Sequence, residues 1–348
     1  MSCMAIKRTD VIVVGGGHAG IEAALAATRL GCRVILCTLD AKKIGLMPCN
    51  PSIGGPAKGQ IVGEIDALGG EMGKAADATQ IQMKILNRSR GPAVQCLRAQ
   101  CDKELYSSYM QTVIKNTPLI TIEECEIKEL IIENNTILGV KTKSNTSLLS
   151  KSVVITTGTF LKAIMHTGLE QSIGGRINEK SCETLSGNLT KYFKLGRLKT
   201  GTPPRLHKDS IDYSQMLIQP GDNECLRFSF QTLPNDNYLQ QLPCYRTNTT
   251  SATHEIILQN LDRSPLFTNV IKGKGPRYCP SIEDKIVRFK DKPSHYIFIE
   301  PESRSLDSIY PQGLNTSLPH DIQEKMLRSM PGLADVAILK WGYAVEYD

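Results

Sequence analysis

The chain has 348 residues, 41% of them hydrophobic, and a formal net charge of +6. This length accommodates two domains or one large domain with an insertion, and the charge permits an anionic partner without requiring one. No apolar run approaches the length of a membrane span. The residues before the first strand lack the apolar core of a signal peptide and are too few for a transit peptide. We therefore expect a cytoplasmic protein without a membrane partner.

Eleven cysteines are present, and no two have C-x-x-C spacing. Without a secretory signal, reduced thiols are expected rather than a disulfide framework, and we expect no metal site. Most of these cysteines should be small buried side chains. Cys32 and Cys37, which flank or lie in a predicted strand, are examples.

Residues 11–38 have the pattern of a nucleotide-binding βαβ unit. A β-branched strand, Val11–Val14, enters a glycine cluster, and a helix over 20–30 and a strand over 33–38 follow. This context turns G-x-G-x-x-G into a dinucleotide-binding hypothesis. Gly15 would make the tight turn, Gly17 would let a pyrophosphate approach, and Gly20 would let the helix pack closely. A glycine-rich turn without a ligand is the alternative.

The second strand of this unit departs from the usual nucleotide-binding pattern. An acidic residue often ends that strand and binds the ribose hydroxyls. Here the strand ends at Thr38, and Asp40 comes two positions later. The ribose contact is therefore not assigned, and NAD is not assumed for this position.

The rest of the chain divides by composition. Residues 45–73, rich in glycine and proline, predict an ordered loop over a ligand with a helix at 61–68. Further along, we expect a basic helical segment at about 75–112, a β-meander at about 118–142 and a strand at 151–157. Short β-like runs such as 228–230 and 296–299 dominate from about residue 196.

This organisation resembles the two-dinucleotide flavoproteins. In that family the strand ending in Thr-Gly returns to the sheet beside the first strand, and the first glycine motif binds FAD. We therefore predict an α/β fold with a Rossmann-like FAD-binding domain at 1–200. A second, largely antiparallel β domain at 201–348, inserted into the first, would be associated with NAD and substrate.

Two cysteines lie in proline-containing loops and are candidates for chemistry. Cys49 follows Pro48, and Cys279 precedes Pro280, while Lys58 and Arg277 are cations close in sequence. Such cations lower a thiol pKa, and a thiolate can add to an electrophilic ring carbon such as that of a pyrimidine. Taken alone, each cysteine also fits a structural role.

Basic residues cluster at 271–292, among glycines and prolines. A phosphate-binding loop is one interpretation of this cluster, and a solvated charged face is the other.

Seven strings of residues together resemble one family. They are 15–20, 49–55, 66–70, 91–94, 196–205, 261–265 and 275–285. The resemblance, which runs over nearly the whole chain, is to the tRNA uridine 5-carboxymethylaminomethyl modification enzymes, the MnmG (GidA) family. Strings of this length are far more specific than a single glycine motif.

The resemblance implies an FAD enzyme that uses NADH and methylene-tetrahydrofolate as carbon donor. It would modify C5 of the wobble uridine of certain tRNAs together with a GTPase partner, MnmE. It also implies a homodimer and, for the full-length protein, a heterotetramer with the GTPase.

Site residues follow from the same resemblance. Cys49 and Cys279 match two catalytic cysteines, Ile127 matches a backbone contact to FAD, and Cys182 matches another FAD contact. The FAD turn would comprise Gly15, Gly16, Gly17, His18, Ala19 and Gly20. His18 could lie over the flavin or cap the helix, and no proton-transfer role is assigned to it. The segment associated with NAD would comprise Gly275, Pro276, Arg277, Tyr278, Pro280, Ser281, Ile282, Glu283, Asp284, Lys285, Ile286, Val287, Arg288 and Phe289.

Two departures from the family pattern leave alternatives open. The usual Pro-Gly-Tyr-Ala is replaced by residues 341–344, Trp-Gly-Tyr-Ala, and the sequence stops at Asp348 where the family continues. We therefore expect the C-terminal region that binds tRNA and the GTPase to be absent. A truncated, non-catalytic remnant that binds FAD or a partner is one alternative. A folate-dependent tRNA uridine methyltransferase is the other.

Overall fold

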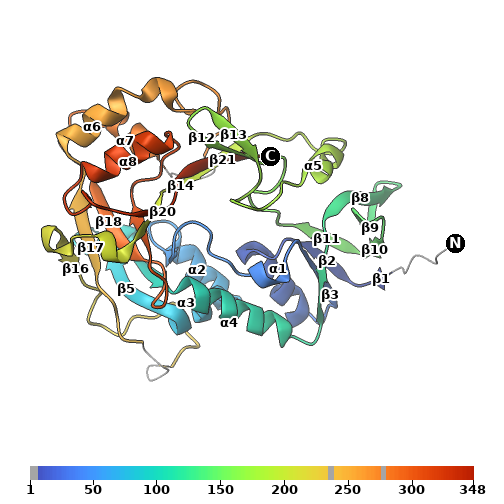
Figure 1. The fold of residues 1–348 in the computed structure, drawn as a ribbon. Helices are drawn as coiled ribbons and strands as arrows, with labels where there is room; N and C mark the ends of the chain where they lie inside the picture. The colour runs from blue at the N-terminus through green and yellow to red at the C-terminus, as the bar shows by residue number, and fades with distance from the viewer. Residues whose placement is uncertain (1–6, 234–238, 276–279) are drawn as a thin grey trace.

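The computed structural model describes residues 7–233, 239–275 and 280–348 (Figure 1). A parallel sheet forms the N-terminal centre, with strand order β11-β2-β3-β7. Its strands are Ser152–Ile155, Val11–Val14, Val34–Thr38 and Ile120–Glu124. Strand β3 is buried throughout, as expected for a parallel strand covered on both faces. The predicted return of the 151–157 strand beside the first strand is confirmed, because β11 pairs with β2.

Two helices pack against one face of this sheet. They are α1 (His18–Arg29) and α4 (Lys103–Lys115), and their apolar positions share one core with Val13 and Leu36 of the sheet. The first βαβ unit thus has the predicted elements, with bounds that differ by one or two residues. Cys37 is buried, as predicted, whereas Cys32 is half-buried.

A second sheet covers the other face through a separate apolar cluster. Its order is β1-β10-β9-β8, formed by Lys7–Arg8, Ser147–Leu149, Thr136–Thr142 and Ile127–Glu133. A tight turn joins β8 to β9, where Asn134 and Asn135 have φ of 49° and 59°. Of the predicted meander, the first strand, β7, joins the parallel sheet instead, because it pairs with β3.

The predicted helical segment at 75–112 is wrong over residues 80–101, more than half of its length. Helix α3 (Met72–Thr79) is followed by β5 (Gln80–Leu86), the short helix η2 (Pro92–Val94) and β6 (Cys96–Cys101). These strands and β4 (Ser52–Gly54) form a sheet of order β4-β6-β5. The apolar residues Ile81, Met83 and Ile85 recur at every second position, which is the period of a strand.

The glycine-rich region at 45–73 is ordered and contains more regular structure than predicted. Besides β4 it includes helix α2 (Gly59–Ala67), and the one-turn helix η1 (Ala41–Lys43) precedes it. The predicted helix at 61–68 corresponds to α2.

The C-terminal half contains a six-stranded antiparallel sheet of order β16-β17-β18-β19-β15-β20. Its strands are Leu217–Gln219, Cys244–Asn248, Tyr296–Pro301, Ser308–Gln312, Arg205–His207 and Ile338–Lys340. Helices α6 (Ser251–Leu258), α7 (Ile282–Arg288) and α8 (His320–Arg328) share one apolar core with this sheet. Short helices η3, η4 and η5 span Lys208–Ser210, Tyr213–Gln215 and Leu261–Arg263. The predicted antiparallel character is confirmed, but residues 228–230 form no strand.

A fifth sheet joins the two halves of the chain (Figure 1). Its order is β13-β12-β21-β14, formed by Glu170–Ile173, Ile164–Thr167, Tyr343–Tyr347 and Leu198–Thr202, and helix α5 (Glu183–Leu189) lies between β13 and β14 in the chain. The predicted boundary between residues 200 and 201 therefore cuts through β14. Among the described residues, no helix is long and apolar enough to cross a membrane.

Candidate functional site

The glycine turn links β2 to α1 and depends on two close backbone approaches. Gly15 has a φ of 119°, and a Cβ built on it would lie 2.2 Å from the carbonyl oxygen of Thr156 on the neighbouring strand. A Cβ on Gly20 would lie 1.8 Å from the carbonyl oxygen of Gly15. Both positions therefore require glycine for the packing of turn, strand and helix.

Gly17 differs because the space beside it is open. It is the N-cap of α1, the first turn of the helix carries no acidic residue, and among the described residues no side chain caps this end. A Cβ on Gly17 would meet nothing within 4 Å. The first backbone N–H groups of a helix lack intrahelical partners and attract anions. An uncapped end with open space above it fits a phosphate group.

His18, the first residue of α1, packs edge-on against the ring of Tyr106 with 5.5 Å between centroids. Its Nδ1 is buried and has no hydrogen-bond partner among the described residues. Burial lowers the pKa of the imidazole to about 4, so the ring is neutral at pH 7. Of the remaining turn residues, Ala19 is exposed and Gly16 lies close to Thr38.

Ile127 and Cys182 lie in the apolar cluster under the second sheet. Both are almost completely buried. Backbone groups of Cys182 are already engaged, because its N–H donates to the Phe160 oxygen at 2.8 Å and its oxygen accepts from Lys162 at 3.1 Å. Burial raises the pKa of the Cys182 thiol to about 11. A contact of either residue with FAD stays a prediction.

Of the 275–289 segment, Pro276, Arg277, Tyr278 and Cys279 lie outside the described residues. Most of the remainder forms α7, with Ser281 as N-cap and Asp284 completing a capping box. Its buried members are Ile282, Glu283 and Ile286. Burial raises the pKa of Glu283, whose carboxylate oxygen accepts from the Thr316 hydroxyl at 2.9 Å.

The other members of this segment lie nearer to solvent. Lys285 donates to the Gly313 carbonyl at 2.9 Å, and Val287 and Phe289 are exposed by 37% and 42%. Gly275, Pro280 and Arg288 are likewise not buried. The buried half of α7 therefore serves packing, and an NAD contact by this segment stays a prediction.

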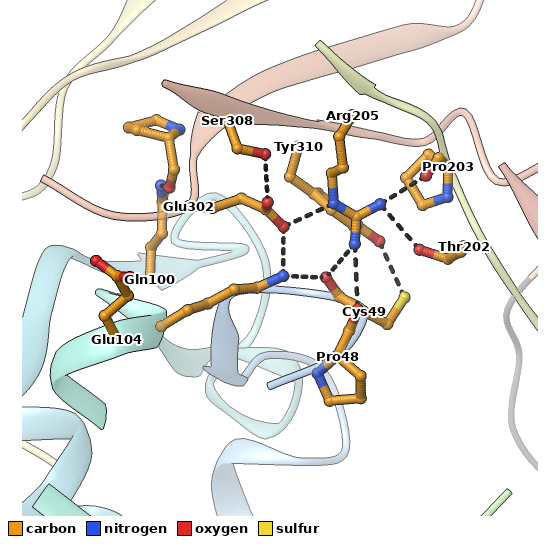
Figure 2. Close-up of polar contacts among 12 residues, drawn as sticks. Pro48, Cys49, Gln100, Glu104, Thr202, Pro203, Arg205, Glu302, Ser308 and Tyr310 are labelled. Atoms are coloured by element: carbon orange, nitrogen blue, oxygen red, sulfur yellow. Dashed lines mark hydrogen bonds and ion pairs between the residues drawn. The ribbon is translucent and has the colours of Figure 1, made fainter. Parts of the chain in front are cut away.

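Cys49 lies at a junction between the two halves of the chain (Figure 2). Its Sγ is 3.5 Å from the carbonyl oxygen of Gly201 and 3.5 Å from the hydroxyl of Tyr310. Residues 45–49 lead to it directly from the glycine turn, because the N–H of Gly45 donates to the Gly16 oxygen at 3.0 Å. Four residues of chain reach at most about 14 Å, so the Cα atom of Cys49 lies within that distance of the Cα atom of Gly45.

A buried ion cluster holds the main chain of Cys49 (Figure 2). The Cys49 oxygen accepts from Lys103 Nζ at 2.8 Å and from Arg205 Nη2 at 2.9 Å. Glu302 lies between the two cations, pairing with Arg205 Nε at 2.7 Å and with Lys103. Its second oxygen accepts from the Ser308 hydroxyl at 2.6 Å. Arg205 is held in addition by the Pro203 oxygen, which accepts from its Nη1 at 2.6 Å, so the clamp on Cys49 is a connected hydrogen-bond network.

The charges of the cluster are unequal. Burial opposes ionisation of Glu302, but Arg205 and Lys103 outweigh it and lower the pKa of the carboxyl to about 2. Burial lowers the pKa of Lys103 to about 8, because Glu302 offsets only part of the desolvation and Arg205 repels the ammonium. These shifts agree with each other, since two cations share one carboxylate. The cluster therefore leaves a net positive charge beside Cys49.

Comparison with known proteins identifies the family. The family described as glucose inhibited division protein A (GIDA) matches residues 10–348. The chain belongs to this family. The structure of Aquifex aeolicus GidA in its form I crystal has a TM-score of 0.92 and 50% identity, covering 98% of this chain and 58% of that one.

Curated relatives of this GidA-family chain bear a common name, tRNA uridine 5-carboxymethylaminomethyl modification enzyme MnmG. That of Streptococcus agalactiae serotype Ia is 50% identical over 340 residues, which are 97% of this chain and 54% of the relative. That of Bdellovibrio bacteriovorus is 51% identical over 346 residues, which are 99% of this chain and 54% of the relative. The chain thus spans about half the length of the curated relatives it matches.

In this GidA-family chain, sequence reasoning missed the partners of Cys49. Lys103, Arg205, Glu302 and Tyr310 were not among the predicted site residues. Arg205 ends one of the family-like strings, which was an available signal. Glu302 follows strand β18, which already carries another glutamate, Glu300, and acidic residues are mostly exposed, so the sequence gives no comparable signal for it.

Proposed function

We propose that this chain is the FAD-binding and thiol-bearing part of a flavin-dependent tRNA uridine-modifying enzyme. The enzyme would install a carboxymethylaminomethyl-type group at C5 of the wobble uridine. NADH, methylene-tetrahydrofolate and the GTPase MnmE would be required, the full-length protein acting as a homodimer within a heterotetramer. The observation that carries the proposal is the short path from an uncapped, open glycine turn to a clamped cysteine.

The glycine turn fits the pyrophosphate of FAD. Gly17 offers open space at the N-terminus of α1, where the first backbone N–H groups of the helix would meet the ligand. Bound FAD would supply two-electron redox chemistry. The chain's own contribution would be to hold the phosphates with backbone N–H groups, while Gly15 and Gly20 keep strand and helix in contact.

Cys49 would supply the nucleophile for the uracil ring, with Cys279 as the second functional thiol. Cations beside a cysteine are typical of sites that carry a reactive thiol. Lys103 and Arg205 both lie against the Cys49 main chain. Their shared carboxylate, Glu302, keeps them oriented without neutralising both.

The test has two parts. First, the purified chain is examined for flavin absorbance and titrated with FAD, and FAD binding is expected. Second, full-length protein is incubated with tRNA, MnmE, NADH and methylene-tetrahydrofolate, and its nucleosides are analysed by mass spectrometry.

A carboxymethylaminomethyl-type wobble uridine is the expected product. Methylated uridine outside the anticodon would instead indicate the folate-dependent methyltransferase. Flavin binding without any modification would indicate a non-catalytic remnant.

A further inference from the structure

We propose that Tyr310 is a positioning residue for Cys49, donating its hydroxyl hydrogen to the sulfur and fixing the direction in which the thiolate points. This inference deepens the proposed function and rests on it for its catalytic meaning. The contacts of Tyr310 that carry the inference do not depend on the proposed function. The reactivity of the Cys49 thiol can also be measured without tRNA.

The contacts of the sulfur assign the direction of this hydrogen bond. A carbonyl oxygen only accepts, so the Cys49 thiol hydrogen points to the Gly201 oxygen, 3.5 Å away. The Tyr310 hydroxyl, also 3.5 Å from Sγ, is then the donor. When the thiol loses its proton, the hydroxyl can remain the donor, whereas the carbonyl offers none. Tyr310 is therefore placed to stabilise the thiolate.

Tyr310 is able to keep its proton and its position. Burial, followed by the effect of Cys49, raises the pKa of its hydroxyl well above the usual value. The ring is 2% exposed, and the Arg205 guanidinium lies over its face, 4.8 Å from the centroid. Lys103 Nζ is 5.8 Å from the same centroid. Cation–π contacts of this kind hold an aromatic ring in orientation.

The same two cations contact both the main chain of Cys49 and the ring of Tyr310. Arg205 and Lys103 hold the Cys49 main chain through its carbonyl oxygen, and they hold the ring whose hydroxyl contacts Sγ. Backbone and hydrogen-bond donor are therefore fixed by one cluster. Tyr310 comes from β19 and Cys49 from the loop before β4, 261 positions apart. The thiol is consequently oriented only in the folded protein.

The test is site-specific alkylation of the purified chain with iodoacetamide across a range of pH. The tryptic peptide 44–58 contains Cys49 alone, and the peptide 209–227 contains the exposed Cys225 as an internal reference. In Tyr310→Phe we expect Cys49 alkylation at neutral pH to slow by about tenfold, the effect of losing a hydrogen bond to a charged group. The half-maximal rate should move to higher pH, while Cys225 is unchanged.

A matched variant separates this effect from general damage. Tyr109→Phe removes another hydroxyl hydrogen bond, from Tyr109 to Glu71 at 2.8 Å, and should leave the Cys49 profile unchanged. Unfolding midpoints of both variants show whether the fold is retained. If the Cys49 profile of folded Tyr310→Phe equals that of the unmodified chain, or if Tyr109→Phe shifts it equally, the assignment is overturned.

The outcomes also separate this inference from the proposed function. Slowed Cys49 alkylation in Tyr310→Phe, together with unimpaired tRNA modification by full-length Cys49→Ser, would keep the Tyr310 contact and refute the nucleophile. An unchanged alkylation profile with a Cys49→Ser variant that cannot modify tRNA would refute the role of Tyr310 alone.

Discussion

The glycine turn and the Cys49 site are encoded in opposite ways. The turn is contiguous, and Gly15 and Gly20 are required by close backbone approaches within residues 15–20 and to Thr156, which follows the adjoining strand. The Cys49 site draws on α4, β15, β18 and β19, with partners up to 261 positions away. A sequence motif describes the glycine turn, whereas the Cys49 site can be predicted only from the strand topology. The two sites should therefore fail in different ways when mutated.

Serine at Cys49 should produce the largest effect, and it should be on chemistry alone. Replacing sulfur by oxygen removes little volume, so stability and flavin content should be retained. Modification of tRNA by the full-length protein should fall by roughly 10³ or more, as when a covalent nucleophile is removed. Cys279→Ser should behave alike. Single-turnover modification with flavin occupancy measured in parallel is the assay, and full rates in both variants would contradict the thiol mechanism.

Alanine substitutions at Gly15 and Gly17 should have different main effects, the first on protein stability and the second on flavin binding. Gly15→Ala places a Cβ at a φ of 119° and 2.2 Å from a carbonyl oxygen, and should lower the free energy of unfolding by on the order of 3–4 kcal/mol. Gly17→Ala meets open space, so its cost should be about 1 kcal/mol. It should nevertheless abolish flavin binding, because the methyl group occupies the approach of the pyrophosphate.

Urea unfolding of the flavin-free chain and FAD titration measure these two effects of the alanine changes. Equal free energies of unfolding for Gly15→Ala and Gly17→Ala, or undiminished flavin binding by both, would contradict a packing role for Gly15 and a ligand-binding role for Gly17.

Neutralising Glu302 should destabilise the assembled site in a pH-dependent way. Its pKa is lowered from 4.5 to about 2, so its contribution is present above about pH 4.5 and lost as the pH falls toward 2. Linkage converts this shift into about 3 kcal/mol. At pH 7, Glu302→Gln should be less stable than the unmodified chain by about this amount, and the difference should shrink in acid.

Asp321→Asn is the matched control for Glu302→Gln. It breaks an exposed ion pair with Arg263 and should cost less than about 1 kcal/mol. Urea unfolding at several pH values compares the two variants. A pH-independent difference for Glu302→Gln would show that the carboxylate charge does not stabilise the cluster.

The smallest effect is expected from serine at a cysteine that only packs. Cys37 is 1% exposed in β3, so Cys37→Ser buries a hydroxyl and should cost about 1–2 kcal/mol. Cys225→Ser, at an exposed position, should stay within about 0.5 kcal/mol. Thermal unfolding of the two variants side by side is the measurement. Equal midpoints would mean that Cys37 tolerates a hydroxyl in the core.

The sequence predicted the parts of the fold that depend on local pattern. Strand Val11–Val14, helix α1 and strand β3 lie within one or two residues of their predicted bounds, because apolar runs and glycines encode them directly. The hairpin β5–β6 was missed because its basic residues were interpreted as belonging to a helix. Lys84 and Arg98 instead face each other across the two strands.

The site was predicted only in its contiguous part. Cys49 is a candidate because of its proline-containing loop, but nothing near it in sequence indicates Glu302 or Tyr310. These residues reach Cys49 through antiparallel pairing of β18 with β19 and of β19 with β15. Register of this kind depends on distant segments, which a single sequence does not specify.

Strand β21 also has a consequence for how the chain folds. It lies between β12 and β14 and pairs with both. Residues 343–347 must therefore be in place before β12 and β14 can become part of one sheet. Contacts of such long sequence separation form slowly. During synthesis, which delivers the N-terminal segments first, β12 and β14 therefore wait with unpaired edges. We expect this sheet to close late, and its open edges are where a folding intermediate would be most vulnerable to aggregation.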